Sequence, residues 1–296
     1  LGGARERLVD RTQLRRPCAA PASLEALADA APASDLEHYV ALDADQGAVH
    51  TQRHLAPSTA QMSMQERATL AWLMMDREIQ QNEAYRGAGS TASVLLLHSL
   101  DVPTAPWYAS EYLAVTTVQL GDTRLVLCDA ETGEAIPLTR LHHPDDPIES
   151  DRLSRQGAGV LTDSFGESRF LGTLANTRSF GDTQAKRYGM TAEPEVQTHI
   201  LQGSRFAFIA GLSQGIGDVM TDQELVDECR YASHPQQAAE RIMKYAEDLG
   251  AEDNATILCI PLRGWGAIRG EDRTALQRRD RRLNTDIYRN RRNLCL

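Results

Sequence analysis

Short apolar runs in this chain repeatedly end at an acidic motif. Such runs, rich in Val, Leu and Thr, are typical of strands, so the acids follow strand ends. Acids from several strand ends can converge, and carboxylate oxygens are the ligands that Mg²⁺ and Mn²⁺ prefer. We therefore expect a hard-cation site. The motifs are Asp43-Ala44-Asp45, Gly121-Asp122, Gly181-Asp182, Gln214 with Asp218, and Asp253-Asn254, and Gln214 stands where an acid is expected.

Composition excludes several classes of protein. The 296 residues carry a net charge of −10, which argues against a nucleic-acid-binding protein as a whole. No apolar run approaches the roughly 20 residues of a membrane-spanning helix. The five cysteines form no CxxC pair, which argues against a zinc site and favours free thiols in a reducing, intracellular compartment.

Two consecutive apolar runs predict a β-hairpin. Residues 112–119 and 124–128 are rich in apolar and β-branched side chains, which is typical of strands. Leu120-Gly121-Asp122-Thr123 between them has the composition of a turn. This interpretation places Asp122 at the hairpin tip.

The remaining pattern predicts an α+β fold with antiparallel sheets, because strands come in hairpin-like pairs and helices are grouped between them. Capping boxes are expected at Ser63–Glu66 and Thr221–Glu224. Helices are predicted over 64–86, 147–157, 221–231 and 234–249, and strands over 37–43, 89–100, 205–212 and 255–262, with 89–100 expected to be buried.

The composition changes after Leu262. Residues 263–292 carry ten Arg and four acids, a net charge of +6, so the rest of the chain carries about −16. The segment has few apolar residues and little reason to join the core, so a solvated extension is expected. Docking of this Arg-rich tail on RNA or on an acidic protein surface is the alternative. We predict a domain over 1–262 and an extension over 263–296.

Taken in order, the motifs resemble those of the metal-dependent PP2C protein phosphatases. The resemblance covers roughly residues 1–262, and it looks most like divergent fungal and mitochondrial members, which makes a mitochondrial location an expectation. It implies a sandwich of two antiparallel β-sheets flanked by helices. The motifs are GARERLVDR (3–11), LDADQG (42–47), GSTA (89–92), QLGDTR (119–124), LANTRSFGD (174–182), SQGIGDVMTDQELVD (213–227) and EDNATI (252–257).

The resemblance implies two metal ions bridged by a water that attacks the phosphate of phosphoserine or phosphothreonine. Arg5 matches the phosphate-binding arginine, and Asp10 matches the second acid of the N-terminal motif. Asp43 matches the aspartate that bridges the metals, and Ala44 the residue that binds through its carbonyl. Asp253 matches the last direct ligand.

Other acids match less direct roles in the family. Asp122 and Asp218 match accessory acids near a third metal, and Asp182 matches an acid whose role is less direct. Asp45 replaces the histidine proposed as general acid, so Asp43 and Asp45 are the candidate catalytic residues.

Two positions depart from the family's metal ligands. Val9 stands where an acidic ligand belongs and cannot ligate, and Gln214 offers only a neutral carbonyl oxygen. These losses favour a pseudophosphatase that acts as a scaffold or regulatory subunit, with a phosphoprotein or another protein as its partner. The alternative is an active Ser/Thr phosphatase dependent on Mg²⁺ or Mn²⁺. A pseudophosphatase could function without any bound metal.

Overall fold

The computed structural model describes residues 62–85, 87–158, 160–162, 168–251 and 253–293. The chain divides into two compact units, residues 1–74 and 75–296. The described part of the first unit begins helix α3 (Met64–Gln81), which continues into the second. The predicted capping box is confirmed: the Ser63 N–H donates to Glu66 Oε2 at 2.7 Å, and the Glu66 N–H donates to Ser63 Oγ at 3.2 Å. The predicted strand 37–43 lies outside the described residues.

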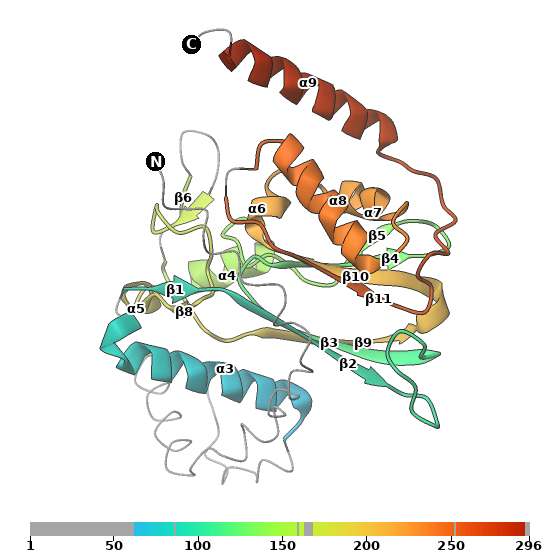
Figure 1. Cartoon of the computed structure of the whole chain (residues 1–296). Helices are drawn as coiled ribbons and strands as arrows, with labels where there is room; N and C mark the ends of the chain where they lie inside the picture. The colour runs from blue at the N-terminus through green and yellow to red at the C-terminus, as the bar shows by residue number, and fades with distance from the viewer. Residues whose placement is uncertain (1–61, 86, 159, 163–167, 252, 294–296) are drawn as a thin grey trace. The chain divides into compact units, whose positions relative to one another are not determined.

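Two antiparallel sheets form a sandwich in residues 75–296 (Figure 1), which confirms the predicted α+β fold class. Apolar side chains fill the space between them, among them Leu113, Leu127 and Ile209. The four-stranded sheet has the order β11-β10-β4-β5, made of Ile257–Pro261, Phe206–Leu212, Arg124–Asp129 and Ala135–Pro137. The three-stranded sheet has the order β2-β3-β9, made of Ala92–Ser99, Tyr112–Leu120 and Glu195–Gln202.

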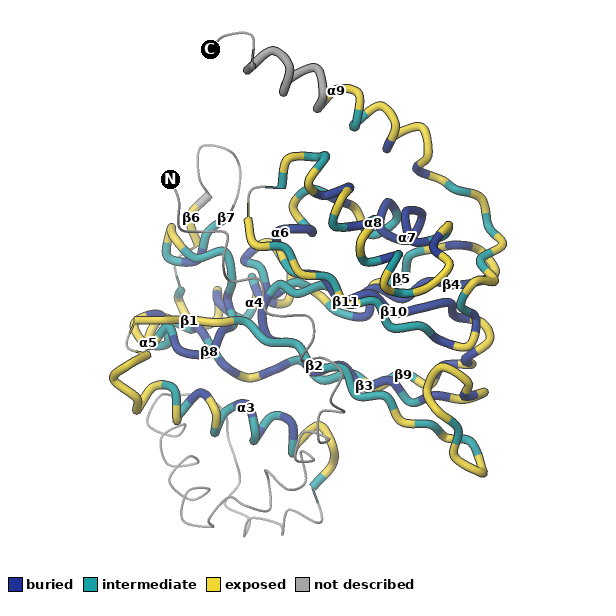
Figure 2. The backbone as a smooth tube through the Cα atoms, in the orientation of Figure 1, coloured by how far each residue is buried: buried dark blue, intermediate teal, exposed yellow. Residues whose placement is uncertain are grey.

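The predicted hairpin of β3 and β4 is wrong, because the two strands belong to different sheets. β3 pairs with β2 and β9, whereas β4 pairs with β10 and β5. Both strands are largely buried (Figure 2) and lie between two neighbours, so their sequence carries no sign of which strand each one pairs with. The chain crosses from one sheet to the other at residues 121–123.

Helices cover the outer face of the four-stranded sheet. They are α6 (Gln214–Gly217), α7 (Asp222–Cys229) and α8 (Pro235–Asp248), and they bury Ile216, Leu225 and Ile242 against that sheet. The Thr221–Glu224 capping box is present and Pro235 occupies the first turn of α8, as predicted.

Short elements complete the second unit. The predicted strand 89–100 divides into β1 (Gly89–Ser90) and β2, and both are exposed or half-buried rather than buried, because β2 is an edge strand with one neighbour. A short 3₁₀ turn, η3 (Glu83–Tyr85), follows α3, and another, η4 (Gly203–Arg205), precedes β10. The others are α4 (Pro147–Arg155), β6 (Val160–Thr162), β7 (Ser168–Phe170), β8 (Phe180–Gly181) and α5 (Thr183–Lys186).

The Arg-rich tail forms helix α9 (Ala275–Asn293), and its first turns are anchored. Thr274 and Arg278 are only 7% and 5% exposed. The expectation of a wholly solvated tail is therefore wrong for this part, because buried acids on α7 bind its arginines. The boundary between domain and extension at 262 stays a prediction. Within the described residues, no helix combines the length and apolarity needed to cross a membrane.

Candidate functional site

An open pocket of about 460 Å³ lies beside the connection between β3 and β4. Three residues singled out from the sequence line it: Asp122, Gln214 and Asp218. Carboxylates and cationic side chains thus share one cavity. The other lining residues are Arg124, Arg140, Leu141, His143, Asp145, Asp146 and Gly217.

The turn that carries Asp122 is fixed by its neighbours. Gly121 has φ 107°, a backbone conformation that favours glycine, and a Cβ there would overlap the Thr91 side chain. The buried Gln119 side chain donates from Nε2 to the carbonyls of Gly121, at 3.1 Å, and Thr123, at 2.7 Å. The GSTA motif, through Thr91, therefore packs on the QLGDTR motif.

A buried histidine, His142, holds the same turn from the other side. Its Nδ1 accepts the Gly121 N–H at 2.9 Å, so the ring proton is carried on Nε2. That Nε2 lies 3.4 Å from Glu195 Oε2, and Glu195 Oε1 accepts from Arg140 Nη2 at 2.7 Å. His142 and Arg140 together outweigh the effect of burial and lower the pKa of Glu195 to about 2. Arg140 is thereby oriented beside the pocket.

The opposite wall begins where β10 ends. The Ser213 N–H donates to the Thr256 carbonyl at 3.0 Å, and a Cβ on Gly215 would overlap the Asn254 carbonyl. The SQGIGD and EDNATI motifs therefore touch through their backbones. Gln214 and Asp218 are both exposed in the pocket wall, and Asp253 is exposed with its backbone next to Gly215.

Asp182 belongs to a separate contact. Its backbone is left-handed, with φ 44°, and its Oδ2 accepts from Ser179 Oγ at 2.7 Å. A Cβ on Gly89 would overlap this carboxylate, so the pairing of β1 with β8 requires glycine there. Of the acids singled out from the sequence that the structure describes, Asp182 and Asp253 do not line the pocket.

The third wall lies at the start of α4, a helix that the sequence predicted over 147–157, but its pocket residues Asp145 and Asp146 were not singled out. Asp146 caps this helix, its side chain accepting the N–H groups of Ile148 and Glu149 at 2.9 and 3.2 Å. His143 Nδ1 lies 3.5 Å from Asp145 Oδ2. Asp146 followed directly by Pro147, with Glu149 three residues after the Asp, is a readable start signal for the helix.

Beneath this wall lies Glu149, which is 1% exposed. Burial alone would raise the pKa of its carboxyl, but Arg178 and Arg152 donate hydrogen bonds to it, as does Thr177, and the pKa falls to about 2. Thr177 Oγ1 also donates to the His142 carbonyl at 3.0 Å. Glu149 therefore links α4 to the segment that holds the Asp122 turn.

The described residues do not by themselves make a metal site. The pocket offers the oxygen donors that hard cations take, but in the described part of the chain no group of three or more His, Cys, Asp or Glu is placed to hold an ion. The other predicted site residues lie outside the described residues: Arg5, Val9, Asp10, Asp43, Ala44 and Asp45.

Comparisons with known proteins agree on one family. The profile of the family described as "Protein phosphatase 2C" matches residues 10–255. "Protein phosphatase 2C homolog 4" of Schizosaccharomyces pombe is 44% identical over 161 residues, 54% of this chain and 41% of its own length. "Protein phosphatase 1K, mitochondrial" of Xenopus laevis is 32% identical over 178 residues, 60% of this chain and 44% of its own length. The chain thus spans less than half the length of these relatives.

Solved structures share the fold. A serine-threonine phosphatase 2C from Toxoplasma gondii has a TM-score of 0.53 at 19% identity, covering 80% of this chain and 77% of its own. A sex-determining protein of C. elegans has a TM-score of 0.51 at 19% identity, covering 83% of this chain and 53% of its own.

Proposed function

The chain belongs to the protein phosphatase 2C family, and we propose on this premise that it is a metal-dependent hydrolase of phosphoserine or phosphothreonine in a protein substrate. The observation that supports this most is the pocket, where Asp122 and Asp218 share a cavity with Arg124 and Arg140. Carboxylates attract cations and guanidinium groups attract phosphate, and phosphate-ester hydrolysis needs both.

The two arginines supply the phosphate-binding side of the pocket. Arg124 Nη1 lies 3.3 Å from Asp222 Oδ1, and Arg140 is bound to Glu195. Because each guanidinium has one edge held by an acid, its orientation is set before substrate binds. Bound Mg²⁺ or Mn²⁺, on which the family typically depends, would supply a water of lowered pKa.

Gln214 sets the expected strength of the metal site. It lies in the pocket wall with a neutral amide oxygen in place of a carboxylate, so we expect the metal concentration for half-maximal activity to be high. The same residue favours the second candidate function, a pseudophosphatase that binds a phosphoprotein or another protein without turnover.

Phosphopeptide hydrolysis by the full chain, titrated with Mn²⁺, tests the proposal. We expect turnover that a chelator removes and that Asp122→Asn lowers by about 10–100-fold, as for residues that support a metal ligand shell. Glu131→Gln, an exposed acid outside the pocket, is the matched control and leaves the rate unchanged.

Calorimetry separates the two candidates. Gln214→Asp is expected to raise Mn²⁺ affinity and to lower the Mn²⁺ concentration needed for turnover. A folded wild-type chain that binds phosphopeptide but shows no hydrolysis above background, with Gln214→Asp gaining metal affinity, would identify the pseudophosphatase.

A mitochondrial location is also proposed, because one relative is named as mitochondrial. Fractionation of cells that express the full-length protein checks it.

A further inference from the structure

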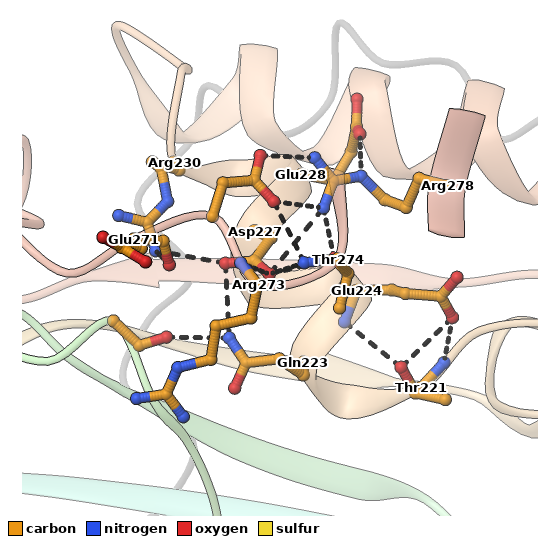
Figure 3. Close-up of polar contacts among 12 residues, drawn as sticks. Thr221, Gln223, Glu224, Asp227, Glu228, Arg230, Glu271, Arg273, Thr274 and Arg278 are labelled. Atoms are coloured by element: carbon orange, nitrogen blue, oxygen red, sulfur yellow. Dashed lines mark hydrogen bonds and ion pairs between the residues drawn. The ribbon is translucent and has the colours of Figure 1, made fainter. Parts of the chain in front are cut away.

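Buried hydrogen bonds and ion pairs hold the segment around residues 273–278 of the Arg-rich tail on α7 (Figure 3). Asp227 is fully buried, and its Oδ2 accepts the N–H groups of Arg273 and Thr274 at 3.1 Å each. Its Oδ1 accepts from Arg230 at 3.1 Å. Asp227 of α7 therefore anchors the segment that leads into α9.

A second acid, Glu228, extends the anchor. Its Oε2 lies 3.1 Å from Arg278 Nε, and its Oε1 lies 3.0 Å from Arg241 Nη2 and 3.3 Å from Arg282 Nη2. Arg278 is also bound to Asp272, with Nη2 2.8 Å from Oδ2. These contacts fix the first turns of α9 on the domain.

One turn further along α9, Arg281 reaches the N-terminus of α7. Its Nη1 donates to both carboxylate oxygens of Glu224 at 2.7 Å, and Glu224 is fully buried. The same carboxylate accepts the Thr221 N–H at 2.9 Å and the Tyr245 hydroxyl at 3.0 Å. Burial alone would raise the pKa of Glu224, but these donors hold it below its usual value. Glu224 is therefore charged when Arg281 binds it.

The other edge of Arg281 binds the loop between α6 and α7. Its Nη2 donates to the Val219 carbonyl at 2.6 Å, one residue after Asp218. Arg124 donates to the next carbonyl, that of Met220, at 3.4 Å. A second cavity of about 370 Å³ is lined by Arg281 and by residues 217–222, and it shares Arg124, Gly217 and Asp218 with the candidate site.

We propose that Arg281 is a positioning residue for the candidate site, through which the tail of the same chain holds the loop that carries Asp218. The anchor formed by Asp227 and Glu228 brings α9 to the domain, and Arg281 joins Glu224 to the Val219 carbonyl. Loss or displacement of the tail frees that loop and weakens the site. The effect on turnover rests on the proposed phosphatase function, whereas the hold on the loop does not.

Hydrogen exchange of the backbone amides tests the hold directly, in the full chain. In the loop, Asp218, Val219 and Met220 donate their N–H groups to carbonyls of α6 and are protected while the loop is in place. In Arg281→Ala, we expect exchange of residues 217–222 to be faster by about tenfold, with the strands unaffected. Arg279→Ala, an exposed arginine on the same helix, is the matched control and leaves exchange unchanged.

Arg281→Lys gives a second, milder variant that keeps the charge. A lysine binds as a single point, so it can hold Glu224 or the Val219 carbonyl but not both in one plane. We expect intermediate exchange in residues 217–222. Unchanged exchange of residues 217–222 in Arg281→Ala would overturn the proposal. Exchange that is equally faster in β10 and β11 would also overturn it, because it would show a purely structural role.

Turnover adds an independent readout. We expect Arg281→Ala to raise the Mn²⁺ concentration for half-maximal activity more than it lowers kcat, because the loop that carries Asp218 is displaced while the rest of the pocket is intact. Equal kinetics for Arg281→Ala and Arg279→Ala would contradict the positioning role. Absence of turnover in the wild type would count against the phosphatase proposal alone, because the exchange experiment still decides the hold.

Discussion

The two walls of the pocket that carry Asp122 and Asp218 are supported in different ways. Hydrogen bonds from Gln119 and to His142, both buried, hold the Asp122 turn. Arginines hold the Asp218 loop, and Arg281 comes from beyond the matched family region, which ends at residue 255. Exposed ionic contacts are screened by salt, whereas buried contacts are screened much less. The wall that carries Asp122 is therefore stabilised by residues of the domain alone. The wall that carries Asp218 depends also on the tail and on the salt concentration.

Removing the anchor of the second wall has the largest expected effect. Asp227→Ala removes the buried carboxylate that pairs with Arg230 and Arg278, and breaking a buried ion pair typically costs about 3–5 kcal/mol. Urea unfolding followed by circular dichroism measures the loss. Asp280→Ala, an exposed acid on α9, is the control and should stay within about 0.5 kcal/mol of wild type. Equal stabilities for the two variants would show that the tail is not anchored through Asp227.

The third wall, at the start of α4, has an ionic dependence of its own, which appears with acid rather than with salt. The pKa of Glu149 is lowered from 4.5 to about 2. Since the folded-state pKa is the lower one, its contribution, of about 3 kcal/mol, is complete above pH 4.5 and is lost as the pH falls through 2. Unfolding free energies of wild type and Glu149→Gln, measured across this range, should converge at the acid end. Curves that stay parallel would contradict this.

His142 carries a smaller effect, confined to the first wall. His142→Leu leaves the buried Gly121 N–H without its acceptor, which costs about 1–3 kcal/mol. His142→Gln retains an acceptor oxygen and should recover part of the loss. Hydrogen exchange should be faster at residues 120–123 and unchanged at 217–222. Faster exchange of both segments would mean that the two walls are not independent.

Salt gives the smallest change and the sharpest comparison. Raising NaCl from about 0.05 to about 0.5 M should accelerate exchange of residues 217–222 by a fewfold, because a partly exposed ion pair contributes about 0.2–1 kcal/mol. Residues 120–123 should not change. Equal responses would remove the distinction between the walls.

Local signals in the sequence predicted local structure well. The Thr221–Glu224 box and Pro235 fixed two helix starts, because their contacts lie within one turn of the chain. The order of motifs predicted the fold, and three of the proposed site residues share one pocket.

Contacts between distant segments were not predictable in the same way. The predicted pairing of β3 with β4 was wrong because a buried apolar strand does not indicate in its sequence which strand it pairs with. The prediction of a solvated tail failed because the acids that bind the tail lie 46 to 57 residues away, at Asp227 and Glu224. Charge balance suggested only that the tail is attracted to something acidic; the structure shows that the acids belong to the same chain.

The crossing between the sheets has a mechanical consequence for the pocket. Asp122 lies on the short connection that leaves the three-stranded sheet, and Gln214 follows a strand of the four-stranded sheet. Arg124, two residues after Asp122, is the register partner of Leu212, two residues before Gln214. The crossing therefore brings Asp122 to the end of the sheet that carries Gln214. The pairing of β4 with β10 thus limits how far these two side chains can move apart.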